Sequence, residues 1–171
     1  ETADDFNLAS YDYIIDAIDS LKDKVLLIRR ATDTKSVFFS SMGAALKMDP
    51  TKISVAEFWK VKGCPLAAAL RRKFKQSKRL PRRKFRCVFS EELVPNAVVA
   101  NNCDIDTLPN AQGEGGDAWR PQKAQINGTM AHTTAIFGFT LAGLVVQDIW
   151  KKTNEAAAAG DPSGRSESED K

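Results

Sequence analysis

A strand–helix–strand pattern in residues 11–40 constrains the fold more than any other feature of this sequence. Residues 11–15 (Tyr-Asp-Tyr-Ile-Ile) are β-branched and aromatic between polar neighbours, which predicts a strand. Ser20 and Asp23 have capping-box spacing, and a helix is predicted to about Ala31 along one apolar face: Leu21, Val25 and Ile28. With a second strand expected over 36–40, the pattern predicts a parallel sheet with a right-handed crossover.

Three further elements are predicted downstream. A second capping-box pattern, Ser54-x-x-Glu57, predicts a helix that includes Val55, Phe58, Trp59 and Val61. Pro65 suits the first position of another helix, expected from Leu66 to about Lys75. Residues 86–90 read as a strand, and residues 101–125, rich in Asn, Asp, Gly and Pro, as a long loop.

The last apolar segment is expected to be a helix over residues 129–151. Its continuous apolar part, residues 135–146, is 12 residues long, which fits a buried core helix better than a membrane span. Residues 153–171 contain no large apolar side chain, so they are expected to form a disordered tail. The start of the sequence has no signal-peptide pattern, so a soluble, cytoplasmic protein without a membrane partner is expected.

Positive charge is concentrated in one short run. Residues 71–86 hold ten Lys and Arg and no acid, whereas the rest of the chain holds 15 basic and 22 acidic residues. Such a run favours binding of a polyanion such as RNA, and the alternative is a solvated helix face opposite the chain's own acidic surface. Phe74 and Phe85 within it are expected in the core. The basic residues are Arg71, Arg72, Lys73, Lys75, Lys78, Arg79, Arg82, Arg83, Lys84 and Arg86.

Two carboxylates follow the first predicted strand, Asp16 and Asp19. Ligands of open α/β sheets bind outside the carboxyl ends of the strands, and Mg²⁺ beside a nucleotide phosphate prefers one or two carboxylates. In the alternative interpretation, Asp16 merely ends the strand and Asp19 helps to cap the next helix. The sequence contains neither a GxGxxG nor a GxxxxGK[ST] phosphate-binding motif.

The cysteines and the single histidine carry weaker signals. With three cysteines, no CxxC pair and one histidine, the sequence argues against a zinc knuckle and excludes a multi-histidine metal site. Cys64 precedes a helix and is either reactive or idle, Cys87 is expected in the core, and Cys103 lies in the predicted loop. For His132 a hydrogen-bonded structural role is expected.

Five ordered segments carry a resemblance to a known family. They are Tyr-Ile-Ile-Asp-Ala-Ile-Asp-Ser (13–20) with Lys24, Asp-Pro-Thr-Lys-Ile-Ser-Val (49–55), Pro-Leu-Ala-Ala (65–68), Cys-Val-Phe-Ser-Glu (87–91) and Ala-Ile-Phe-Gly-Phe (135–139). In this order they resemble the tRNA threonylcarbamoyladenosine dehydratases, a branch of the ThiF/MoeB adenylate-forming superfamily. The resemblance runs from about Tyr11 to Ile149.

The resemblance implies the C-terminal part of a ThiF/MoeB-type, Rossmann-like α/β fold with a mainly parallel sheet and flanking helices. It implies an ATP- and Mg²⁺-dependent reaction on tRNA, in which a carboxylate is adenylated and then cyclises with loss of AMP. Asp19 matches the aspartate that contacts the metal in the superfamily, and Asp16 is assigned with it to the nucleotide site. The basic run would contact tRNA, and the longer protein is expected to be a homodimer.

Two departures from the family shape the expectation for this chain. The Gly-rich phosphate loop and the groups that hold ribose and phosphates precede the motif at Asp16 in the family, so residues 1–152 are expected to be a partial domain. Residues 40–45 replace a segment that is often richer in glycine. The catalytic residues remain unassigned, and the chain alone is expected to be inactive and to expose an unpaired edge at residues 11–15. The alternatives are a non-catalytic, basic RNA-binding module and a pseudoenzyme subunit of the same superfamily.

Overall fold

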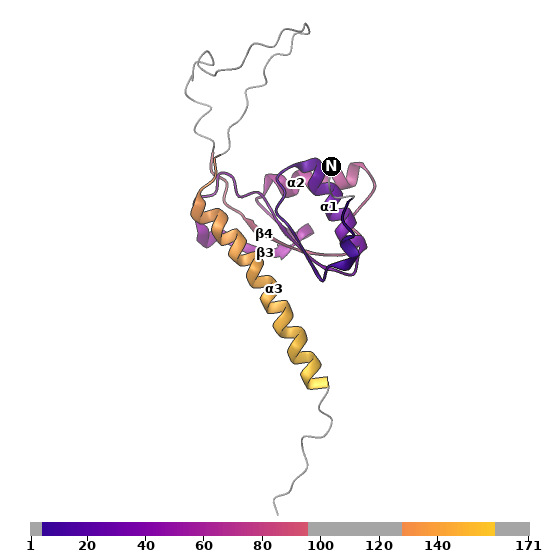
Figure 1. Ribbon diagram of the computed structural model, residues 1–171. Helices are drawn as coiled ribbons and strands as arrows, with labels where there is room; N and C mark the ends of the chain where they lie inside the picture. The colour runs from indigo at the N-terminus through magenta and orange to yellow at the C-terminus, as the bar shows by residue number, and fades with distance from the viewer. Residues whose placement is uncertain (1–4, 96–127, 160–171) are drawn as a thin grey trace, which may run out of the picture.

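The computed structural model describes residues 5–95 and 128–159 (Figure 1). Four strands form one sheet, three longer helices pack on it, and three short 3₁₀ turns connect them. In chain order the elements are η1 Leu8–Ser10, β1 Tyr13–Asp16, α1 Leu21–Asp33, β2 Val37–Ser41, η2 Pro50–Lys52, β3 Ile53–Glu57, η3 Phe58–Lys60, α2 Pro65–Gln76, β4 Arg86–Ser90 and α3 Ala131–Ala159.

The strands are ordered β1-β2-β4-β3. β1 pairs with β2 in parallel, from Tyr13↔Val37 to Asp16↔Ser40, and β2 pairs with β4 in parallel. The predicted strand–helix–strand unit is therefore confirmed, and so is an α/β fold with a mainly parallel sheet. β1 and β3 are the two edges of the described sheet, so β1 has one side without a strand partner there.

Helices α1 and α2 cover one face of the sheet and bury the larger core cluster. Ser20 caps α1 by accepting a hydrogen bond from the amide of Asp23, as its capping box predicts, and α2 begins at Pro65 as expected. Phe74 and Phe85 are buried, which confirms that they belong to the core. The cluster joins α1, α2 and the sheet through Val25, Ile28, Ala67, Leu70, Phe38 and Phe58, among others.

Helix α3 lies on the opposite face, where Phe137, Leu141 and Leu144 pack on Phe39 and Val88. The expectation of a buried core helix is wrong, because only one stripe of α3 is covered. The helix extends past the sheet (Figure 1), and its outward stripe exposes large apolar side chains. These are Phe139 (74% exposed), Val146 (65%), Ile149 (48%) and Trp150 (68%).

Helix α3 is also longer than the sequence suggested. It continues to Ala159, so residues 153–159, expected in the disordered tail, are helical. Alanine has the highest helix propensity, and no glycine or proline interrupts the segment before residue 160. Residues 160–171 and the predicted loop 101–125 lie outside the described residues. Within the described ranges α3 is the one helix long and apolar enough to cross a membrane, by length and composition alone.

The helix predicted from the pattern Ser54-x-x-Glu57 is also wrong. Residues Ile53–Glu57 form strand β3, which pairs antiparallel with β4 from Ile53↔Ser90 to Glu57↔Arg86. Pairing with the buried strand β4 extends over all five residues of β3, so the tertiary context overrides the local capping signal. Helical geometry is limited to the single turn of η3, Phe58–Lys60.

Candidate functional site

The carboxyl ends of β1, β2 and β4 meet at one edge of the sheet, where open α/β folds bind ligands. Asp16 is the last residue of β1, and Asp19 follows it in the loop before α1. The structure therefore brings both predicted carboxylates to the expected edge. They differ in accessibility, because Asp16 is fully buried and Asp19 is exposed.

The Asp16 carboxylate is occupied by groups of the protein itself. Its Oδ2 atom lies 2.8 Å from the Lys24 ammonium and accepts a 2.6 Å hydrogen bond from the Ser40 hydroxyl. Its Oδ1 atom accepts a 2.9 Å hydrogen bond from the backbone N–H of Ile18. These contacts give Asp16 a role inside the protein. Asp19 makes no hydrogen bond or ion pair with the residues that the structure describes, so its carboxylate can accept a ligand.

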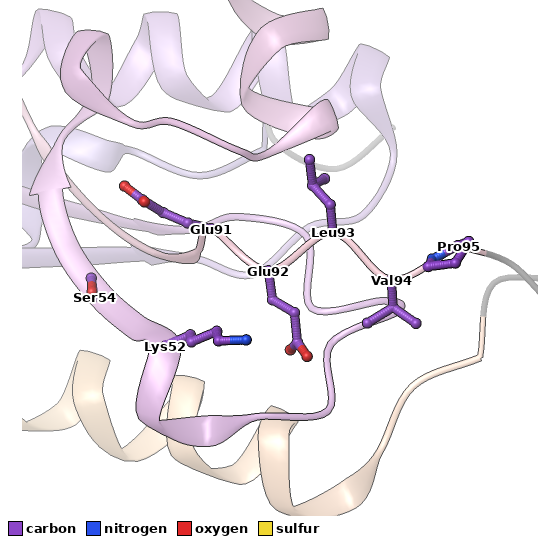
Figure 2. A pocket seen from close by; sticks show the side chains of 7 residues that line it. All are labelled: Lys52, Ser54, Glu91, Glu92, Leu93, Val94 and Pro95. Carbon is purple, nitrogen blue, oxygen red and sulfur yellow. The ribbon is translucent and has the colours of Figure 1, made fainter.

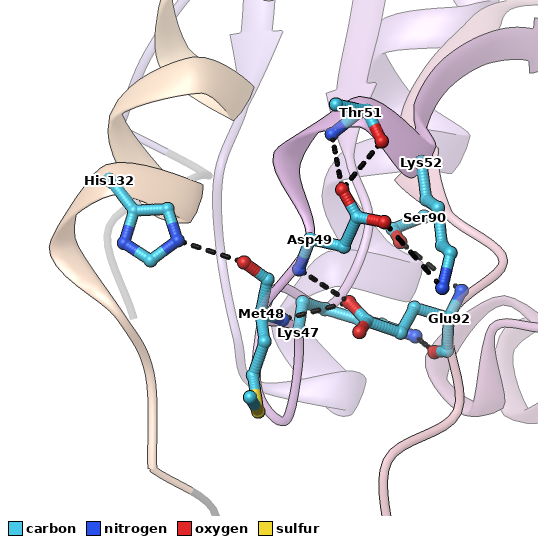
Figure 3. Close-up of polar contacts among 8 residues, drawn as sticks. All are labelled: Lys47, Met48, Asp49, Thr51, Lys52, Ser90, Glu92 and His132. Carbon is cyan, nitrogen blue, oxygen red and sulfur yellow. Dashed lines mark hydrogen bonds and ion pairs between the residues drawn. The ribbon is translucent and has the colours of Figure 1, made fainter.

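A second polar cluster lies at the same edge, where the segment after β2 meets the segment after β4 (Figure 3). The Glu92 carboxylate accepts hydrogen bonds from the backbone amides of Met48 (2.8 Å) and Asp49 (2.9 Å). The buried Lys47 ammonium donates to the carbonyl of Glu92, and burial lowers the pKa of Lys47. His132 Nε2 donates to the carbonyl of Met48 at 2.9 Å, so the predicted structural role of this histidine is confirmed.

The carboxylates of this cluster are used to fix the loop. The amides of Asp49 and Met48 hold the pKa of Glu92 below its ordinary value, and hydrogen bonds from Thr51 lower the pKa of Asp49. Among the described residues no group of three His, Cys, Asp or Glu side chains could hold a metal ion. We therefore interpret this cluster as a clamp that joins three segments of the chain.

This clamp makes stability depend on pH in the acid range. Because the folded pKa of Glu92 lies below its ordinary value of 4.5, its ionised form stabilises the folded chain above that pH, and the contribution is lost as pH falls through the folded pKa. Glu92→Gln is expected to lower the thermal midpoint at pH 7, and the difference from wild type should vanish as the pH falls through the folded pKa of Glu92. The measurement is thermal unfolding across pH, with Glu91→Gln as an exposed neighbouring control. A constant difference at all pH values would contradict the assignment.

An open depression of about 610 Å³ lies beside the clamp (Figure 2). Figure 2 shows the side chains of Lys52 and Glu92 entering it from two different segments. β1 and β3 are the outermost strands on opposite sides of the sheet, three strand spacings of about 4.8 Å apart. The depression lies next to β3, whereas Asp19 follows β1, so the depression does not include Asp19. It is lined by Lys52, Ser54, Glu91, Glu92, Leu93, Val94 and Pro95.

The basic run divides into anchored and free side chains. Arg71 donates to the carbonyls of Phe58 (3.0 Å) and Val61 (2.9 Å). Arg86 stacks over the Phe39 ring at 4.9 Å. The other bases, Arg83 excepted, are exposed and form no hydrogen bond or ion pair through their side chains within the described part of the chain. These seven residues, the free basic surface, are Arg72, Lys73, Lys75, Lys78, Arg79, Arg82 and Lys84.

Arg83 and Arg29 hold the loop of the basic run on α1. Arg83 donates to the carbonyls of Thr32 (3.1 Å) and Ser36 (2.8 Å), where a cation complements the C-terminus of α1. Arg29 donates to the carbonyl of Arg79 at 3.2 Å, a contact that the sequence did not indicate. The loop therefore lies at the amino ends of the parallel strands, opposite the edge that carries Asp19.

The cysteines are mostly structural. Cys87 is buried in β4, as predicted, and burial raises the pKa of its thiol. Cys64 precedes α2 and is also buried, so its thiol is largely shielded from solvent. Cys103 lies outside the described residues.

Comparisons with known proteins give relatives of one kind, although no family model matches the sequence. The chain is 32% identical over 157 residues to a tRNA threonylcarbamoyladenosine dehydratase of Haemophilus influenzae, covering 89% of this chain and 56% of the relative. It is 29% identical over 151 residues to the Bacillus subtilis enzyme of the same name, covering 88% and 56%. The chain thus spans about half the length of these relatives, as expected for a C-terminal portion.

Solved structures of the same kind share the fold. A structure of TcdA (CsdL) superposes with a TM-score of 0.66 at 27% identity, covering 91% of this chain and 56% of the other. The Escherichia coli tRNA N6-threonylcarbamoyladenosine dehydratase, TcdA, in complex with AMP gives a TM-score of 0.61 at 28% identity, covering 87% and 55%. A further structure of that enzyme holds ATP and gives a TM-score of 0.58 at 28% identity, covering 91% and 55%.

Proposed function

We propose that this chain, which is related in sequence and fold to the tRNA threonylcarbamoyladenosine dehydratases, is the C-terminal portion of an enzyme of that kind. In this proposal the chain supplies a metal-contacting carboxylate, Asp19, and a surface for tRNA. The observation that carries it is the free, exposed carboxylate at the edge of the sheet where such folds bind ligands.

The proposed reaction is an ATP-dependent dehydration on tRNA. A carboxylate is a poor electrophile, so ATP first adenylates the carboxylate of threonylcarbamoyladenosine and releases pyrophosphate. The activated acyl group then cyclises, and AMP leaves. The structures of a relative with AMP and with ATP support a nucleotide site in proteins of this kind.

Asp19 fits a role toward Mg²⁺ bound with ATP. Magnesium keeps several waters and takes one or two carboxylates together with phosphate oxygens. Bound there, the ion would neutralise phosphate charge during adenylation. Asp19 offers an uncommitted carboxylate, whereas both oxygens of Asp16 are already engaged inside the protein. We therefore assign the metal contact to Asp19 and treat Asp16 as internal support.

The free basic surface is proposed to bind tRNA away from the reacting nucleotide. Its loop packs on the C-terminus of α1, at the amino ends of the strands. Asp19 lies beyond the carboxyl end of β1, so one strand length, on the order of 10–15 Å, separates the two regions. Cations at that distance contribute to tRNA affinity and leave the chemical step to other groups.

The longer protein is proposed to be a cytoplasmic homodimer. The outward stripe of α3 supports a further protein contact, because a cluster of Phe139, Val146 and Trp150 is exposed on one helix. In this proposal a second copy covers that stripe.

A calorimetric titration tests whether this chain needs the rest of such an enzyme. The 171-residue chain titrated with ATP and Mg²⁺ is expected to give no detectable heat, because the groups that hold the phosphates in the family precede Asp16. The longer protein that contains this chain is the positive control. Tight binding by the 171-residue chain that is lost in Asp19→Ala would contradict the division of roles proposed here.

A second candidate function rests on the free basic surface alone. Seven exposed cations that form no hydrogen bond or ion pair with residues 5–95 or 128–159 would bind RNA whether or not the chain takes part in catalysis. A non-catalytic RNA-binding module, or a pseudoenzyme subunit, predicts salt-dependent RNA affinity and no effect of ATP, even when the upstream sequence is present.

A further inference from the structure

The ion pair between Asp16 and Lys24 is the most deeply buried pair of charges in the described part of the chain. Both side chains are 0% exposed, and their charged atoms lie 2.8 Å apart. Removing two charges from water is costly, and well-packed apolar residues in their place are often as stable or more stable. A contribution to stability alone therefore does not explain why the protein buries this ion pair.

The pair holds both polar backbone groups of a single residue. Asp16 Oδ1 accepts the N–H of Ile18 at 2.9 Å, and Lys24 Nζ donates to the carbonyl of Ile18, also at 2.9 Å. Ser40 donates to Asp16 Oδ2 at 2.6 Å and so ties the pair to β2. The backbone immediately before Asp19 is thereby fixed to the sheet and to α1.

The backbone immediately after Asp19 is fixed by the first turn of α1. The carbonyl of Ser20 accepts a 2.9 Å hydrogen bond from the amide of Lys24, and its hydroxyl accepts one from the amide of Asp23. Asp19 is therefore the exposed residue between two immobilised neighbours. Lys24 takes part on both sides, through its ammonium and through its own amide.

We propose that Asp16, Lys24 and Ser40 are positioning residues that hold the 17–20 loop so that the carboxylate of Asp19 faces its ligand. This inference rests on the proposed function for the role of Asp19. In this inference the buried pair fixes the conformation of the 17–20 loop. Asp16 supports the loop from inside the protein, and Asp19 contacts the ligand.

The test uses the double variant Asp16→Asn/Lys24→Met, which removes both buried charges together. The single variant Lys24→Met leaves an unpaired buried carboxylate and is expected to be strongly destabilised, so it serves only for comparison. Ile28→Val is the matched control, because it loosens the same helix by a small core change that does not touch the loop.

The first measurement is amide hydrogen exchange on the 171-residue chain without nucleotide or metal. The double variant is expected to exchange at least tenfold faster at the amide of Ile18, which donates to the Asp16 carboxylate, with β2 and the C-terminal half of α1 unchanged. Ile28→Val should leave the exchange of the Ile18 amide unchanged relative to the rest of α1. Faster exchange spread evenly over α1 and the sheet, or no change at Ile18, would overturn the inference.

The second measurement is cyclisation by the longer protein that contains this chain. The double variant is expected to lower kcat by about 10- to 100-fold with the KM for tRNA unchanged. If Asp19→Ala has no effect on kcat, the proposed function fails while the exchange result still decides the positioning of the loop. If Asp19→Ala is inactive but the double variant keeps its kcat, the positioning inference fails and the proposed function stands.

Discussion

In the longer enzyme that we propose contains this chain, Asp19→Ala is expected to reduce formation of the cyclic product by at least about 100-fold. A lost metal contact removes several kcal/mol of transition-state stabilisation, and about 1.4 kcal/mol corresponds to a tenfold change in rate. The affinity for tRNA should remain nearly the same, because the free basic surface lies at the opposite end of the strands. The measurement is chromatography of the nucleoside digest, together with a tRNA-binding assay.

Asp23→Ala is the matched control for this experiment. Asp23 is also an exposed aspartate near the start of α1, and only its backbone amide takes part in the helix cap. It should therefore retain normal cyclisation. A normal amount of product from Asp19→Ala would remove the metal role from this residue.

The triple variant Lys78→Gln/Arg79→Gln/Lys84→Gln is expected to weaken tRNA binding by about 10- to 100-fold at physiological salt. Each lost phosphate contact should reduce the slope of log affinity against log salt by about 0.7 to 0.9, so the slope should fall by roughly 2 to 3. The fold should be unaffected, because these exposed side chains form no hydrogen bond or ion pair with the described part of the protein. Filter binding across a salt series measures both quantities.

Two controls test whether the loss of affinity comes from this particular surface or from the overall reduction in positive charge. Lys52, Lys62 and Lys151 are exposed lysines elsewhere, and their replacement by Gln removes the same charge but should leave the slope nearly unchanged. Arg83→Met should act on stability, since Arg83 caps the C-terminus of α1. Equal losses of affinity in the two triple variants would count against a defined RNA surface.

Local signals in the sequence were sufficient for much of the fold. The cap at Ser20 and the proline at Pro65 each act on the turn that follows, so they marked where α1 and α2 begin. The apolar spacing in residues 21–31 gave the buried face of α1. The strand at residues 86–90 was bounded correctly because its apolar residues are buried on both faces of the sheet.

Features set by distant contacts could not be predicted in this way. The pattern Ser54-x-x-Glu57 fits a helix cap, but pairing with β4, 29 residues away at Glu57↔Arg86 and 37 at Ile53↔Ser90, makes the segment a strand. Which arginines are anchored depends on carbonyls of other elements, as for Arg71 and Arg83. The burial of Asp16 could have been inferred from the sequence. Lys24 lies one turn before Ile28 on the buried face of α1, and a buried lysine needs a partner of opposite charge.

Asp19 and the free basic surface lie at opposite ends of the parallel strands, so the length of the strands sets the distance between them. β2 and β4 have strand neighbours on both sides, so strand length sets the spacing between the free basic surface and the carboxylate of Asp19. If the proposed function holds, a tRNA would be selected by the path of its backbone between these two regions. Lengthening the strands would then shift which nucleotide of a bound tRNA lies near Asp19.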